Sequence, residues 1–249
     1  MLTTHPGPGV IYTPYLVSPP TSVAPQHAIM ERLAKGVAYY DGPDGDGTPW
    51  APGEAVVYDL QRLPYEVDRV FRDPPGETYT GFYALGLTSP LYGPVLAVRG
   101  TQELVDWLIN SDPDGVGRLQ FARNWGDVHD WLTVDPDVAG QAVDVTGHSL
   151  GGALAQWFVS EATSAEYDIA IDEVVTFNSP GIPAAQAAKN NDELIGEVTH
   201  YIASGDLVSL AGEAFLEGTW HQASWSRNEW KPVDMLFAAH TSPLLADRL

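Results

Sequence analysis

The segment GHSLGG, from Gly147 to Gly152, constrains this chain more than any other part of its sequence. Residues 141–146 (QAVDVT) predict a β-strand directly before it, and residues 150–164 predict a helix that begins with small side chains. A strand, a G-x-S-x-G turn and a helix in this order present the central serine as a nucleophile. The sequence therefore predicts a nucleophilic hydroxyl on Ser149.

The glycines of this segment fit the same interpretation. In such a turn the neighbouring backbone comes so close that side chains at Gly147 and Gly151 would collide with it, and the strain lifts the hydroxyl above the sheet. The first amides of the following helix lack partners within the helix and point at any anion that forms near Ser149. The alternative is a glycine-rich bend with an idle serine.

Strands and helices are expected to alternate along the chain. The predicted strands are residues 80–87, 94–100, 141–146, 173–177 and 197–203, and the predicted helices are residues 26–40, 103–109, 121–132 and 150–164. This alternation predicts a mostly parallel central sheet with helices on both faces, the α/β-hydrolase architecture. A chain of 249 residues fits one such domain, residues 1–249, and the proline-rich residues 1–25 are predicted to wrap its surface.

Composition excludes several classes of partner and site. The chain has no cysteine, which excludes disulfides and cysteine-ligated zinc. Its formal charge of −21 repels nucleic acid and anionic lipid, so neither is an expected partner. Solubility alone, as in a saline habitat, is the favoured explanation of the charge. No apolar run reaches the roughly 18 to 20 residues of a membrane-spanning helix, and the opening residues do not form a signal peptide.

The remaining members of a catalytic triad must follow the serine in the order acid, then histidine. Asp206 lies in Ser-Gly-Asp-Leu-Val, directly after a predicted strand, where a loop would carry it to the edge of the sheet. Two histidines follow it, His221 and His240. His240 is favoured, because His221 lies among tryptophans and is more consistent with a pocket wall or packing against indole. His148 is expected to point away from the hydroxyl and to be structural.

Four segments resemble the class 3 lipases, relatives of the fungal triacylglycerol lipases, and occur in that family's order. GHSLGGALAQ resembles the nucleophile signature, VLAVRGTQELVDWL the oxyanion segment, TFNSPGIP the strand and turn after the nucleophile helix, and VTHYIASGDLVSL the loop of the catalytic aspartate. The resemblance covers roughly residues 79–245. The resemblance is interrupted at residues 117–131, where the family's Val-His-x-Gly-Phe stretch is missing. The geometry of the family's lid therefore cannot be assigned to residues of this chain.

The resemblance implies specific roles. It identifies Asp206 as the acid and places the histidine near the C-terminus, where His240 lies. It also assigns the oxyanion to the backbone amide of Thr101, with the Thr101 hydroxyl as a further donor, alongside the amide of Leu150 after the nucleophile. It further implies a secreted protein. This chemistry needs no metal and no cofactor.

Two segments could cover the site as a lid, residues 111–125 and residues 211–230. The segment 211–230 is also a candidate for substrate contact. Its candidate contact residues are Phe215, Leu216, Trp220, His221 and Trp225. Exposed, they would form a patch for acyl chains or a lipid interface. Buried, they would close the core over the sheet, and the sequence does not decide between the two.

Three functions compete on these grounds. The leading prediction is a lipase or carboxylesterase that acts on lipid or small ester substrates, with transient contact to a lipid interface. The alternative within the same chemistry is a phospholipase A1 acting on zwitterionic phospholipid. A different class is a catalytically inactive binding module on a hydrolase fold. The presence of Ser149, Asp206, His240 and Thr101 together counts against this last function.

Overall fold

The computed structural model describes residues 25–39, 48–58, 61–73, 79–100, 115–223 and 240. Within them, eight strands form one sheet in the order of the sequence. The strands are β1 (Ala55–Tyr58), β2 (Gln61–Arg72), β3 (Tyr83–Thr88), β4 (Val95–Val98), β5 (Val143–His148), β6 (Ile171–Phe177), β7 (Ile195–Ala203) and β8 (Thr219–Ala223). Strands β1 to β4 pair antiparallel, and β4 to β8 pair parallel.

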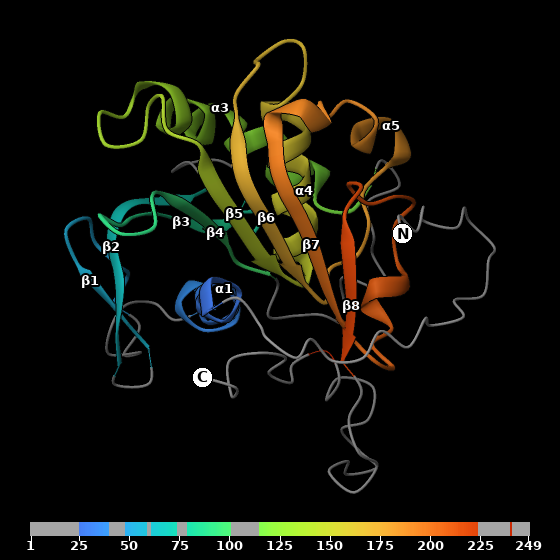
Figure 1. Ribbon diagram of the computed structural model, residues 1–249, viewed down its shortest axis with the longest axis horizontal. Helices are drawn as coiled ribbons and strands as arrows, with labels where there is room; N and C mark the ends of the chain where they lie inside the picture. The colour runs from blue at the N-terminus through green and yellow to red at the C-terminus, as the bar shows by residue number, and fades with distance from the viewer. Residues whose placement is uncertain are drawn as a thin grey trace, which may run out of the picture.

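Helices cover both faces of this sheet, as Figure 1 shows for α1 on one side and α3 and α4 on the other. The helices are α1 (Pro25–Lys35), α3 (Arg118–Val134), α4 (Leu150–Ala162) and α5 (Ala184–Ala187), with 3₁₀ turns η1 (Val37–Tyr39), η2 (Asp192–Leu194) and η3 (Val208–Leu210). The predicted fold class, a mostly parallel sheet with helices on both faces, is therefore confirmed. Strands β1, β2 and β8 were not expected.

Two predicted features fall wholly or largely outside the described residues. The predicted helix 103–109 lies outside the described residues. So do residues 1–24 of the predicted surface-wrapping extension, and Pro25 instead begins α1. Among the described residues, no helix is both long enough and apolar enough to cross a membrane.

Strand β5 shows how the sheet divides the interior. Its side chains alternate between the two faces. Val143 and Val145 join the core formed with α3 and α4, whereas Asp144, Thr146 and His148 are buried on the opposite face. Gln26 of α1 bonds the Asp144 carboxylate there, so that face is covered by α1. A row of buried polar side chains thus leads along β5 toward Ser149.

The turn after β5 brings backbones together as the glycines predicted. A Cβ at Gly147 would lie 2.1 Å from the carbonyl oxygen of Gly151, and a Cβ at Gly151 would lie 2.2 Å from that of Val98. These distances leave no room for any side chain, which confirms the expected collisions. Helix α4 can start directly against the end of β4 only because both positions are glycine.

Candidate active site

Ser149 lies between the end of β5 and the start of α4, in a strained backbone conformation. Its φ is 59° and its ψ is −132°, a combination that residues with a Cβ rarely adopt. The amide of Ser149 donates to the carbonyl of Phe177 at the end of β6, at 3.0 Å. The sheet and α4 together therefore hold the serine in a conformation that an isolated chain would avoid.

The hydroxyl of Ser149 is covered, which differs from the expectation of a group raised clear of the sheet. The residue is 1% exposed, and its Oγ finds no hydrogen-bond partner among the described residues. The end of β4 contributes to this cover, because a Cβ built on Gly100 would lie 3.0 Å from the Cβ of Ser149. The turn has the strained backbone that was predicted, but the hydroxyl is buried and not raised into solvent.

Asp206 follows β7 after the turn at Ser204 and Gly205, and its carboxylate is buried and well bonded. Oδ1 accepts from the amide of Val208 at 3.0 Å, and Oδ2 accepts from the hydroxyl of Ser209 at 2.6 Å. Ser209 is a residue that the sequence analysis missed. Its signal is the local spacing Asp-x-x-Ser, which is common wherever a short polar side chain bonds its own turn.

The structure brings His240 to Asp206. The Nδ1 atom of His240 lies 3.0 Å from Oδ1 of Asp206, and the residue is 2% exposed. Its Nε2 is buried and has no partner among the described residues, as is true of Ser149 Oγ. His221 lies elsewhere, on β8, with its ring stacked on Tyr201 at 5.0 Å between centroids. Of the two candidate histidines, it is His240 that bonds the predicted acid.

The backbone carbonyl of His240 is bonded from two sides. The Nε2 atom of His148 lies 2.8 Å from it, and the Nδ2 atom of Asn178 donates to it at 2.7 Å. Asn178 is itself fixed, because its Oδ1 accepts from the amide of Ala203 at 2.7 Å. The sequence analysis did not single out Asn178, and it expected of His148 only a structural role.

Electrostatics around His148 favour its neutral form. Burial lowers the pKa of His148 well below its usual value, and electrostatic interactions with Lys35 and His240 act in the same direction. Burial also lowers the pKa of Lys35, opposed mainly by Glu31, whose carboxylate lies 3.0 Å away, and by Asp206. A buried ammonium–carboxylate pair on α1 therefore adjoins this part of the site.

The predicted oxyanion donors are only partly within the described residues. Leu150 is the first residue of α4, so its amide has no acceptor within the helix. Thr101 lies outside the described residues. Gly100, the residue before Thr101, lies against the turn that contains Ser149. A Cβ built on Gly100 would lie 2.6 Å from the carbonyl oxygen of His148.

The predicted contact residues of the 211–230 segment mostly pack inward. Phe215 and Leu216 are buried, and Leu216 belongs to the core shared with α4. Trp220 packs against Phe215 and His200, with ring centroids 4.7 Å and 4.5 Å away. Trp225 lies outside the described residues. For the described members, burial favours core closure over an exposed acyl-binding patch.

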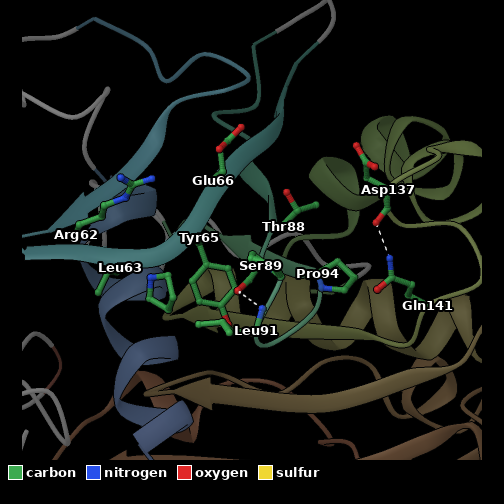
Figure 2. Close-up of a pocket in the computed structure, with 12 residues that line it drawn as sticks. Arg62, Leu63, Tyr65, Glu66, Thr88, Ser89, Leu91, Pro94, Asp137 and Gln141 are labelled. Atoms are coloured by element: carbon green, nitrogen blue, oxygen red, sulfur yellow. Dashed lines mark hydrogen bonds between the residues drawn. The ribbon is translucent and has the colours of Figure 1, made fainter.

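Two other features lie away from Ser149. A surface hollow of about 530 Å³ is lined by residues of β2, of the β3–β4 turn and of the segment after α3, and contains none of Ser149, Asp206 and His240 (Figure 2). Three carboxylates, those of Asp68, Asp135 and Asp137, place one oxygen each within 4.8 Å of one another where α3 ends. One Asp68 oxygen already accepts from the indole of Trp131 at 2.7 Å.

Comparison with known proteins identifies a family for part of the chain. Residues 125–213, which include the serine turn and Asp206, match the family described as Lipase (class 3). No curated protein sequence matches the chain significantly. The resemblance read from the sequence is thereby confirmed, together with its class of activity, that of a carboxylic ester hydrolase of the lipase type.

Solved structures agree on the fold. The chain is similar to a variant of MDLA from Penicillium cyclopium, with a TM-score of 0.57 at 20% identity over 91% of this chain and 94% of that one. It is also similar to a lipase from Rhizopus microsporus var. chinensis (TM-score 0.53, 20% identity, 77% and 74% covered). A third is the Lip2 lipase from Yarrowia lipolytica (TM-score 0.53, 16% identity, 80% and 78% covered). At these identities the likeness concerns the fold alone.

Proposed function

We propose that this chain, which carries the class 3 lipase signature over residues 125–213, hydrolyses carboxylic esters of lipids through an acyl-enzyme on Ser149. The observation that carries the proposal is the buried hydrogen bond of 3.0 Å between His240 Nδ1 and Asp206 Oδ1. His148, the residue directly before the serine in its strained turn, bonds the backbone of the same His240. A carboxylate, an imidazole and a strained serine are the parts of a serine-hydrolase triad.

In the first step His240 Nε2 takes the proton of Ser149 Oγ while that oxygen attacks the ester carbonyl carbon. Asp206 keeps the proton of the neutral ring on Nδ1, which leaves Nε2 free to accept. The unpartnered state of Ser149 Oγ and His240 Nε2 supports this pairing, because one is a buried donor and the other a buried acceptor.

The negative charge that develops on the carbonyl oxygen is stabilised by backbone amides. The proposed donors are Leu150 at the start of α4 and Thr101 after β4, with the Thr101 hydroxyl as a further donor. One such donor contributes roughly 3 to 4 kcal/mol of transition-state stabilisation. The intermediate collapses with loss of the alcohol, which receives the proton from His240, and water then releases the acyl group by the same steps.

Access to this site requires a movement of the chain. Ser149 is 1% exposed and His240 is 2% exposed, so an ester reaches the hydroxyl only after covering atoms move away. The charge of −21 favours a neutral or zwitterionic ester over an anionic one. Neutral acylglycerols and small uncharged esters are therefore the proposed substrates.

Hydrolysis of tributyrin and of a p-nitrophenyl ester series tests the proposal, together with labelling by a fluorophosphonate probe. Wild type is expected to hydrolyse the esters and to take up one probe per chain at Ser149. Ser149→Ala should do neither. Ser160→Ala is a matched control, because Ser160 is also buried on α4 but bonds the carbonyl of Trp157. Equal hydrolysis by wild type and Ser149→Ala would contradict the proposal.

The same assays separate the competing functions. Release of the sn-1 fatty acid from phosphatidylcholine in preference to tributyrin turnover would replace the acylglycerol substrate with a phospholipid. A wild-type protein that neither hydrolyses the esters nor reacts with the probe would be a binding module, and the proposal would be wrong.

A further inference from the structure

We propose that His148 is a positioning residue, which fixes the backbone of His240 while Tyr39 fixes the ring of His148. The proposal rests on the proposed function, because it concerns the imidazole that is proposed to accept the proton of Ser149. It gives a role in the reaction to a side chain that bonds Tyr39 and the backbone of His240 and is not itself proposed to contact the substrate.

The contacts form a continuous chain from one side of the site to the other. The hydroxyl of Tyr39, in the turn after α1, lies 3.1 Å from Nδ1 of His148. The Nε2 atom of the same ring lies 2.8 Å from the carbonyl oxygen of His240, and the two imidazole rings are 4.7 Å apart between centroids. Tyr39 also bonds the backbone of Gly100, directly before the proposed oxyanion residue Thr101.

The chemistry of these groups fixes the direction of each hydrogen bond. A carbonyl oxygen can only accept, so Nε2 of His148 must carry a proton. Burial lowers the pKa of His148, with further contributions from Lys35 and His240, so the ring stays neutral and its Nδ1 is an acceptor. Tyr39 must then donate to Nδ1. Replacing its hydroxyl would remove the partner that selects this tautomer.

These bonds matter because, among the described residues, hydrogen bonds hold His240 at two places, the Nδ1 atom of its ring and its backbone carbonyl oxygen. Asp206 bonds Nδ1 at one edge of the imidazole, while His148 and Asn178 bond the backbone carbonyl of the same residue. Two anchors of this kind set the direction in which Nε2 points. Since His148 is the residue directly before Ser149, the anchor also ties the position of the imidazole to that of the nucleophile.

A second buried histidine provides a matched control within the same sheet. The Nδ1 atom of His200, on β7, lies 2.7 Å from the hydroxyl of Thr176, and its Nε2 lies 3.0 Å from the carbonyl oxygen of Leu216. It thus bridges a hydroxyl and a backbone carbonyl, as His148 does. The carbonyl that it holds belongs to a core residue and not to a proposed triad member.

The test compares kcat and KM for a p-nitrophenyl ester in four variants, His148→Leu, His148→Gln, Tyr39→Phe and His200→Leu. A misplacement of about 1 Å costs about 100-fold in rate, so kcat of His148→Leu should fall by about that factor with KM nearly unchanged. The amide of His148→Gln can still donate to the carbonyl and should recover most of that loss. Tyr39→Phe should lower kcat several-fold, and His200→Leu should leave it near wild type.

Rates are referred to the folded fraction, measured by near-ultraviolet circular dichroism and by fluorophosphonate labelling at saturation. If His148→Leu does not fold, Tyr39→Phe still decides, because a purely structural role predicts that loss of the Tyr39 hydroxyl leaves kcat of the folded protein unchanged. Equal losses of kcat in His148→Leu and His200→Leu would also overturn the proposal. A wild type without esterase activity or labelling would instead show that the proposed function is wrong.

Discussion

Strand β5 carries a buried titratable side chain near each end, and the two ends use it differently. Asp144 lies at its start and is 4% exposed, and burial, followed by the nearby charge of Glu173, raises the pKa of that carboxyl to about 7. His148 lies at its end and is 5% exposed, and burial lowers the pKa of that ring. In both cases burial favours the neutral form.

The neighbours of the two residues make the difference. Asp144 accepts from Gln26 of α1 at 3.0 Å, in a region that also holds Glu173 and its partner His27. His148 instead bonds the backbone of His240, beside two buried atoms that have no partner among the described residues, Ser149 Oγ and His240 Nε2. One end of the strand satisfies its polar groups, and the other adjoins two buried polar atoms that have no hydrogen-bond partner among the described residues.

The largest expected effect comes from the same substitution at two buried aspartates. Asp206→Asn removes the negative charge and replaces one carboxylate oxygen with an N–H donor, so on the proposed mechanism the proton of His240 is no longer held on Nδ1 and kcat/KM for a p-nitrophenyl ester should fall by about 10³- to 10⁴-fold. Asp144→Asn should leave kcat/KM within about twofold of wild type, because its carboxylate bonds Gln26 at the other end of β5. If kcat/KM fell as far in Asp144→Asn as in Asp206→Asn, the two ends of β5 would not differ in function.

Much of this fold was predictable because local patterns and tertiary structure agree. The runs that became β4 and β5 are buried along their whole length, and those that became β6 and β7 are buried mainly toward their C-terminal ends. The helical patterns of α3 and α4 pack directly on this sheet. Strands β1 and β2 were missed. Their segment alternates charged and apolar residues near a sheet edge, and its β-structure depends on pairing with β3, which no local pattern reveals.

The site residues that lie in short sequence motifs were the easiest to predict. Ser149 and Asp206 follow strands in short turns, so their neighbourhood is readable from the sequence. The roles of Tyr39 and Asn178 are not, because they depend on contacts 109 residues apart in one case and 62 in the other. Burial of the Ser149 hydroxyl was also missed, because a turn motif predicts the direction of a side chain but not what covers it.

The second prediction concerns the pH dependence of stability at the Asp144 end. Well below pH 4 the carboxyl is protonated in both the folded and the unfolded state, so burial of the ionised form does not affect stability there. Between pH 4 and 7 the unfolded state loses that proton first, so the free energy of unfolding falls as the pH rises. A shift from 3.8 to about 7 corresponds to roughly 4 kcal/mol, reached above pH 7.

Asp144→Asn should remove this dependence. Its advantage over wild type in urea unfolding should be close to zero at pH 4 and approach roughly 4 kcal/mol at pH 8. Asp127→Asn, which changes an exposed carboxylate on α3, is the control and should show no such trend. A difference between Asp144→Asn and wild type that stays constant from pH 4 to pH 8 would show that Asp144 ionises normally in the folded protein.

The third prediction tests how tightly the backbone is packed around the turn that follows β5, where α4 begins. A Cβ at Gly151 would lie 2.2 Å from the carbonyl oxygen of Val98, so Gly151→Ala must push α4 away from β4 and should cost about 3 kcal/mol of stability. Gly126→Ala is the control, because Gly126 is an exposed position of α3 with nothing within 4 Å of an added Cβ, and it should gain about 0.5 to 1 kcal/mol. Thermal unfolding of both variants measures the difference. Similar stabilities would mean that α4 can move freely.

The smallest effect isolates the strain at Ser149. Ser149→Ala and Ser149→Gly both remove the buried hydroxyl, but only glycine tolerates φ 59° and ψ −132° without strain. Relief of strain outweighs the larger chain entropy of unfolded glycine, so Ser149→Gly should be about 1 kcal/mol more stable than Ser149→Ala. At Ser160, in the interior of α4, the same pair should show the opposite sign, because glycine is about 1 kcal/mol worse than alanine in a helix. Urea unfolding measures the stability difference between the glycine and alanine variants at each position. If that difference had the same sign at positions 149 and 160, the turn would hold no strain, and the two ends of β5 would differ only in their side chains.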